Sequence, residues 1–167
     1  MNRLAGAWNR FWFARFDPFS LGPCRISMGT LWLMVVLFMT PNWERFFGPD
    51  GLPGANDPYL AHKQDWFSVF RWGDSYVNLW FWYYFAVVTA VLWIVGYWTR
   101  TMTVCVWLMI SSMIHRNLLI INGEDVVLHT MFWWMIFMPL GRSMSIDAVL
   151  YRRKLQRENK TDERPLP

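Results

Sequence analysis

The side chains with the widest chemical repertoire in this 167-residue chain gather in one short stretch between two apolar segments. They are His115, Arg116, Asn117, Asn122, Glu124, Asp125 and His129. Together they offer cationic and amide donors, two carboxylates and two imidazoles. Ionisable groups are costly in hydrocarbon. A set of them within a sequence apolar enough for a membrane therefore indicates either a turn at the bilayer surface or a polar pocket.

Four roles are compatible with these residue types. Arg116 can pair with Asp125 or Glu124 and fix the hairpin between two helices, because an unpaired charge at this depth would be expensive. The Arg, His and Asn donors also suit a quinone headgroup or a lipid phosphate in a lipid-accessible cleft. His115 and His129 could supply two axial ligands to a haem, or a desolvated His or carboxylate could abstract a proton. We favour the structural role and assign no catalytic residue and no other metal site, since such clusters are frequently structural.

The composition is that of a membrane protein. Hydrophobic residues make up 54% of the chain and aromatic residues 19%, with 13 Trp. Membrane proteins place Trp at both lipid–water boundaries. Charged residues reach only 17%, below the quarter typical of soluble domains. The formal charge of +4 does not indicate a nucleic-acid partner, because Lys and Arg concentrate near the chain ends rather than on one folded face.

Four apolar segments predict four membrane spans that position the polar set. They cover residues 23–40, which end at the breaker Pro41, and residues 76–96, 101–121 and 126–140. A span needs about 20 residues, so the fourth is short unless its helix begins earlier. We expect Asn122 as its N-cap, because Glu124 and Asp125 then lie in the first turn against the positive helix end. The predicted fold is all-α, an integral-membrane four-helix bundle in residues 1–147 followed by a charged cytoplasmic tail in residues 148–167.

The distribution of basic residues orients this bundle. Arg residues crowd before the first span and after the fourth, whereas the loops between spans one and two and between three and four carry most acidic residues. By the positive-inside rule both termini are cytoplasmic, with the bundle in the inner membrane. Two amphipathic helices are expected at the interfaces, in residues 1–16 and 57–71, because aromatic side chains suit a helix lying on a membrane surface.

A series of short motifs runs through most of the chain. They are Phe16-Asp17-Pro18, Arg25 entering the first span, the loop at 48–53, Gly96-Tyr97-Trp98-Thr99-Arg100, Arg116-Asn117, Asn122-Gly123-Glu124-Asp125, Phe137-Met138-Pro139-Leu140-Gly141 and Ser145-Ile146-Asp147. In this order they resemble the HTTM domain, the membrane domain shared with vitamin K-dependent γ-carboxylase, over its first four spans. A weaker similarity, at the level of a four-helix membrane bundle, is to DoxX-like proteins.

The resemblance implies the architecture but not the carboxylase activity. Carboxylase-like relatives continue with further membrane helices and a large extracytoplasmic β-rich domain, and their reaction is attributed to a lysine base. The predicted spans here contain no Lys. We therefore expect a non-catalytic subunit that packs against lipids and partner membrane proteins, or holds lipid or quinone, within a larger respiratory or photosynthetic complex. The alternative is a minimal membrane enzyme, redox or carboxylase-like, that uses a pocket of His115, Arg116 and Asp125.

Overall fold

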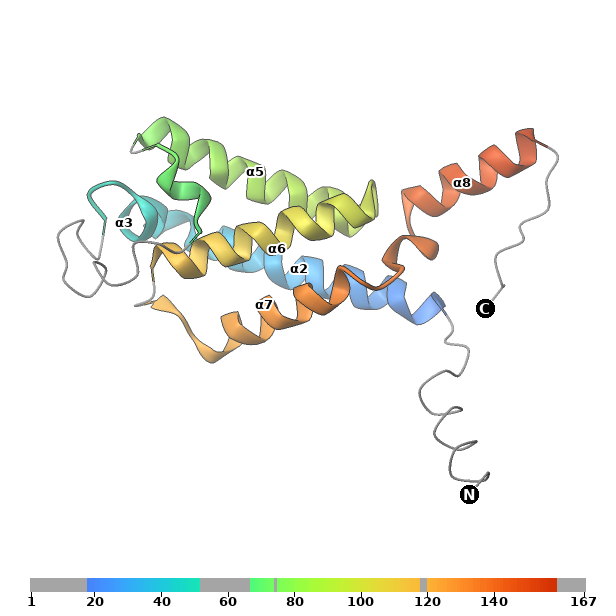
Figure 1. The fold of residues 1–167 in the computed structure, drawn as a ribbon, viewed down its shortest axis with the longest axis horizontal. Helices are drawn as coiled ribbons and strands as arrows, with labels where there is room; N and C mark the ends of the chain where they lie inside the picture. The colour runs from blue at the N-terminus through green and yellow to red at the C-terminus, as the bar shows by residue number, and fades with distance from the viewer. Residues whose placement is uncertain (1–17, 52–66, 74, 118–119, 159–167) are drawn as a thin grey trace, which may run out of the picture.

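The computed structural model describes residues 18–51, 67–73, 75–117 and 120–158, which form helices joined by turns (Figure 1). The α-helices are α2 (Leu21–Met39), α3 (Trp43–Phe47), α5 (Tyr76–Val95), α6 (Thr99–Arg116), α7 (Gly123–Met135) and α8 (Ile146–Arg157). Short 3₁₀ turns lie at Pro18–Ser20, Thr40–Asn42, Val69–Arg71 and Leu140–Arg142. No strand occurs among the described residues, and the prediction of an all-α fold is confirmed.

Helix α6 occupies the centre of the arrangement. It packs against both α5 and α7, and α2 packs along α5 (Figure 1). The close approach of α2 to α5 depends on Gly29, where a Cβ atom would lie 2.6 Å from Cγ1 of Ile94 and 2.9 Å from Cε3 of Trp93. Helix α8 extends away from the bundle at the end where α2 begins (Figure 1).

Aromatic side chains fill one end of the interior. The ring centroid of Trp43 lies between 4.6 and 5.8 Å from those of Phe47, Phe70 and Tyr83. Such contacts stabilise a core beyond the area they bury. This cluster ties the short helix α3 and the turn before α5 to the bundle, and it supports the backbone on which the polar groups below converge.

The first α-helix, α2, ends at Met39 with Thr40 as its C-cap, next to the end predicted at Pro41. The chain continues through the turn at Thr40–Asn42 into α3, which gives 27 helical residues from Leu21 to Phe47. Proline has no N–H to donate to the carbonyl four residues earlier, which is that of Leu37. That carbonyl instead accepts hydrogen bonds from the N–H of Thr40, the C-cap of α2, and from the Thr40 hydroxyl at 2.7 Å.

The second segment was predicted closely. Helix α5 begins after Ser75, whose hydroxyl accepts a hydrogen bond from the N–H of Val77, and it ends at Val95. Gly96 follows with φ of 74°, the left-handed conformation that commonly closes a helix.

The third and fourth segments need correction at their ends. Helix α6 ends at Arg116 rather than at residue 121, because Asn117 adopts an extended conformation. Helix α7 ends at Met135 rather than 140, and turns lead from it to α8. The expected N-cap is confirmed, since Asn122 precedes α7 and its N–H donates to Oδ2 of Asp125 at 2.9 Å.

Two helical stretches of the described residues, rather than four, are long and apolar enough to cross a membrane by length and composition: Leu21–Phe47 and Tyr76–Val95. Central helix α6 carries Thr, Ser, His and Arg, which lower its hydropathy. With 13 residues, α7 is only about 20 Å long, short of the roughly 30 Å of a hydrocarbon core.

The remaining expectations concern the flanking segments. Residues 1–16 and most of 57–71 lie outside the described residues, so the predicted amphipathic helices are not described. The beginning of the charged tail forms the exposed helix α8, where Lys154 and Glu158 form an i,i+4 ion pair at 4.0 Å. Such exposed pairs contribute little to stability.

Candidate functional site

Three of the predicted site residues lie in sequence at the end of α6 and contact backbone carbonyls. Nδ1 of His115 is 2.7 Å from the carbonyl oxygen of Phe67 and donates to it, since a carbonyl only accepts. Arg116 donates to the carbonyls at the end of α3, from Nη2 to Gly48 at 3.0 Å and from Nε to Phe47 at 3.3 Å.

Asn117 is the most buried of the three, with 1% of its surface exposed. Its Nδ2 donates to the carbonyl of Phe46 at 3.0 Å. The last carbonyls of a helix lack partners within it. The side chains at the end of α6 therefore bind those at the end of α3 and fix the two helix ends together.

The two acidic residues, Glu124 and Asp125, lie in the first turn of α7. Asp125 binds the N–H of Asn122, and Glu124 is exposed to the surroundings in the first helical turn. Carboxylates at this position are stabilised by the positive end of the helix. The expected pairing of Arg116 with Glu124 or Asp125 is not among the contacts of the described residues, because Arg116 turns towards α3 instead.

His129 lies apart from these groups, between α7 and α6. Its Nε2 is 2.9 Å from the hydroxyl of Ser111, and its ring stacks on that of Trp107 with centroids 5.5 Å apart. The Ser111 hydroxyl also donates to the carbonyl of Trp107 at 2.9 Å, which commits its one hydrogen. Nε2 of His129 then donates to the Ser111 oxygen. Because Nε2 carries the proton in this arrangement, His129 cannot act as a base that deprotonates Ser111.

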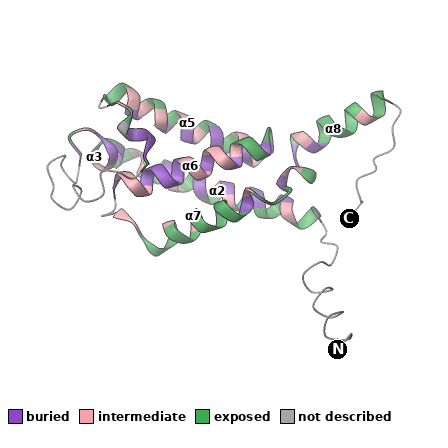
Figure 2. Cartoon of the chain, viewed as in Figure 1, coloured by how far each residue is buried: buried purple, intermediate pink, exposed green. Residues whose placement is uncertain are grey.

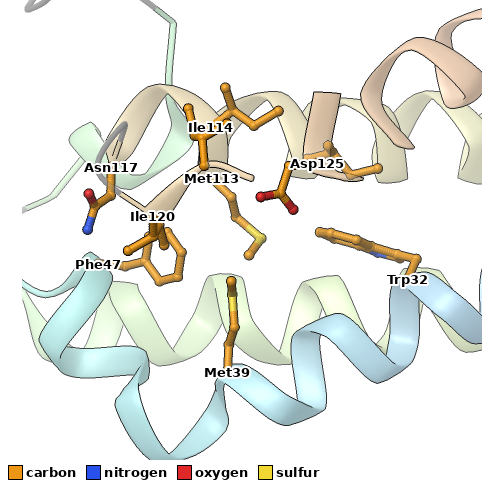
Figure 3. A pocket seen from close by; sticks show the side chains of 10 residues that line it. Trp32, Met39, Phe47, Met113, Ile114, Asn117, Ile120 and Asp125 are labelled. Atoms are coloured by element: carbon orange, nitrogen blue, oxygen red, sulfur yellow. The ribbon is translucent and has the colours of Figure 1, made fainter. Parts of the chain in front are cut away.

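Asn117 and Asp125 line the same small cavity between α2, α6 and α7 (Figure 3). The carboxylate of Asp125 points into it, beside Trp32 of α2 (Figure 3). The cavity measures about 20 Å³, room for roughly one water molecule. Ligand pockets usually measure about 300–1,000 Å³, so this cavity does not accommodate a quinone headgroup.

The predicted residues therefore lie in three groups, although Asn117 of the first group and Asp125 of the second line one small cavity. His115, Arg116 and Asn117 hold helix ends, Asn122 and Asp125 cap α7, and His129 pairs with Ser111. Among the described residues, no group of three or more His, Cys, Asp and Glu side chains is placed to hold a metal ion.

Replacing Asn117 with Leu tests the structural role of this end. The variant keeps the side-chain volume but leaves the Phe46 carbonyl without its donor, and an unsatisfied buried group costs about 1–3 kcal/mol. We expect the free energy of unfolding to fall by that amount in a denaturant titration of the detergent-solubilised protein. Glu124→Gln, on an exposed side chain, serves as the control and should leave stability within about 0.5 kcal/mol.

A second polar centre lies at the opposite end of the bundle, around Arg25. This side chain is completely buried. Nη1 donates to the carbonyl of Leu140 at 2.8 Å and Nη2 to that of Met144 at 2.5 Å. Longer contacts of 3.5 and 3.4 Å reach the carbonyls of Ser143 and Ile94. One guanidinium thus joins the first turns of α2 to the end of α5 and to the segment between α7 and α8.

Asp147 of α8 caps the start of α6 at the same end. Its carboxylate accepts hydrogen bonds from the N–H of Trp98 at 2.9 Å and from the N–H and hydroxyl of Thr99, both at 2.7 Å. Trp98 has φ of 47°, which is uncommon for a bulky residue. Its bond to Asp147, together with that from the Asp147 N–H to the Gly96 carbonyl at 3.0 Å, holds the turn between α5 and α6 in this conformation.

This centre was not predicted from the sequence, although its residues belong to the motifs that carry the family resemblance. Arg25 and Asp147 were named only within those motifs and were given no contacts. A signal existed for Arg25, because a charge inside an apolar segment must find partners. Its carbonyl partners lie between 69 and 119 residues away, and backbone carbonyls leave no trace in the sequence.

The described residues thus define an all-α protein with two helices apolar enough to cross a membrane and a polar centre at each end. No family model, curated protein or solved structure matches the chain.

Proposed function

We propose that this chain is a non-catalytic integral-membrane subunit, related to the first four spans of the HTTM domain, that packs against partner membrane proteins. Its four spans are α2, α5, α6 and the segment from α7 through the turns that follow it to Leu140, and both termini lie on the cytoplasmic side of the inner membrane. Partners within a respiratory or photosynthetic complex cover part of its outer surface.

The observation that carries this proposal is the exposure of the apolar helices. In the candidate spans Leu21–Phe47 and Tyr76–Val95, only 28% and 33% of the most apolar window is buried within the protein. A core helix of a soluble protein with this hydropathy would be mostly buried. Some polar residues, such as Thr103, Ser112 and Asn117, are buried beside the apolar core. An outer surface this apolar suits a bilayer or apolar partners.

The outer face of α5 is the clearest part of this surface. Exposed apolar residues recur at alternating intervals of four and three along the whole helix: Val77, Phe81, Tyr84, Val88, Val91 and Val95. Between 42% and 80% of each side chain is exposed. This heptad spacing is the one with which helices pack side by side. Helix α7 is also largely exposed (Figure 2), including Met131 and Trp134.

The hydrogen bonds that the polar side chains already make favour a packing role over a catalytic one. An acid or base needs a side chain free to exchange a proton with a substrate. His115 and Arg116 bind backbone carbonyls, and Asp125 caps a helix. The cavity at Asp125 is too small for a substrate of quinone size.

Thiol labelling tests the four-span arrangement. Cys24 and Cys105 are free and would first be replaced by Ser. Glu124→Cys at the start of α7 and Gln156→Cys in α8 are both exposed positions. In intact cells, a membrane-impermeant maleimide should label the cysteine at 124, whereas the cysteine at 156 should react only after permeabilisation. Equal labelling of both before permeabilisation would exclude a span between them.

Purification from native membranes in mild detergent tests the partner assignment. Integral membrane proteins should co-purify in fixed stoichiometry, and a photoreactive benzoylphenylalanine at Tyr84 on the α5 face should cross-link to one of them. The same group at Val149 on α8 is the matched control and should give no such product. A solitary protein with a bound chromophore, whose turnover disappears on His115→Ala, would contradict the proposal and favour the enzyme alternative.

A further inference from the structure

A cleft of about 230 Å³ opens between the start of α6, the end of α7 and the start of α8. One wall is apolar and comes from the turn after α7, where Phe137 and Met138 are exposed. The polar side chains in the lining are Thr99, Arg100, Thr103 and Asp147. This cleft is distinct from the cavity at Asp125, which lies between α2, α6 and α7.

Most of the polar groups in this cleft are already engaged. The hydroxyl of Thr99 donates to Asp147, and that of Thr103 donates to the Thr99 carbonyl at 2.7 Å while accepting from the indole of Trp93. Asp147 accepts three hydrogen bonds from Trp98 and Thr99. Arg100 is exposed, and its guanidinium makes no hydrogen bond or ion pair with any described residue.

The cleft contains one positive charge that is not balanced, that of Arg100. Asp147 is compensated by the positive end of α6, which it caps, and by its electrostatic interaction with buried Arg25. The cation of Arg100 has no such counter-charge within the described residues. A guanidinium is the side chain that best matches a phosphate, because its fork of N–H donors binds two oxygens at once.

The aromatic residues beside the cleft are those expected at a membrane surface. Tyr97 and Trp98 are exposed, and their rings stack with centroids 5.8 Å apart. Exposed Trp and Tyr mark the level of the lipid headgroups. Basic pockets between spans on the cytoplasmic side are typical binding places for phospholipid headgroups.

We propose that this cleft binds the phosphate of a membrane phospholipid, with Arg100 holding the phosphate and the exposed side chains of Phe137 and Met138 contacting an acyl chain. The volume fits a headgroup rather than a whole lipid, because it lies below the range of pockets that enclose complete ligands. The inference rests on the proposed membrane function and assigns a phospholipid-binding site to this end of the bundle.

Native mass spectrometry of the detergent-solubilised protein tests the site with phosphatidylglycerol as the probe. Arg100→Gln should weaken phosphatidylglycerol binding about tenfold, the effect of losing one charge-assisted contact. Arg142→Gln is the matched control, since Arg142 is exposed at the same end but does not line the cleft. It should bind as the unchanged protein does. Diacylglycerol, which lacks the phosphate, should bind equally weakly to all three proteins.

Three results would overturn the site. Equal losses in Arg100→Gln and Arg142→Gln would mean that general surface charge attracts the lipid. Competition by inorganic phosphate at the concentration of the lipid would mean that the free anion is the ligand. The thiol labelling above separates this inference from the proposed function. If positions 124 and 156 lie on opposite sides while Arg100→Gln binds lipid normally, the inference fails and the membrane proposal stands.

Discussion

Arg25→Lys is expected to lower the free energy of unfolding by about 3 kcal/mol, although the substitution keeps the charge. Lysine presents its three donors from one atom, whereas the guanidinium reaches separate carbonyls from a planar fork. Leu140 and Met144 supply the two short contacts, and one ammonium would leave at least one of these buried carbonyls unpaired. Unsatisfied buried acceptors cost about 1–3 kcal/mol each, and loss of the planar packing adds to this.

A denaturant titration in detergent, followed by Trp fluorescence, measures this loss. Arg142→Lys provides the comparison, because Arg142 is an exposed arginine at the same end of the bundle and should tolerate the change within about 0.5 kcal/mol. If Arg25→Lys were as stable as Arg142→Lys, the carbonyl contacts would contribute nothing beyond charge, and Arg25 would not be the residue that holds this end together.

The helices themselves could largely be predicted from sequence, because their signals are local. An uninterrupted apolar run placed α5 to within one residue at its end, and the Asn-Gly-Glu-Asp sequence placed the start of α7. The main failure was at a place where side chains contact a distant part of the chain. Helix α6 ends early where Arg116 and Asn117 contact α3, between 68 and 71 residues away.

The candidate site was harder to predict, for a physical reason. Residue types indicate which groups can pair by charge, and so Arg116 was expected beside an acidic residue. In the structure Arg116 binds backbone carbonyls at the end of α3, and Arg25 binds those of the segment between α7 and α8. The positions of these carbonyls depend on the fold and not on residue type. The motifs of the resemblance contain Arg25, Gly96, Thr99 and Asp147, and their order alone could not show that they meet at one end of the bundle.

Gly96→Ala is expected to destabilise the same end through shape rather than charge. Gly96 has φ of 74°, and an added Cβ would lie 2.4 Å from Cβ of Ser145 and 2.8 Å from Nη1 of Arg25. The left-handed backbone costs an L-residue about 1–2 kcal/mol, and overpacking adds about 1–3 kcal/mol. The methyl group would also displace Arg25 from its carbonyls, so the loss should not add to that of Arg25→Lys in the double variant.

Gly123→Ala is the matched control for this prediction. Gly123 is the first residue of α7, and nothing lies within 4 Å of the Cβ that alanine would add. Since alanine favours a helix over glycine, the control should be neutral or slightly stabilising. Urea titrations measure whether the losses in free energy of unfolding add. They compare the two glycine variants, Arg25→Lys, and Gly96→Ala combined with Arg25→Lys. Full additivity in the double variant would mean that Gly96 and Arg25 act independently, and that the added methyl group does not displace the guanidinium from its carbonyls.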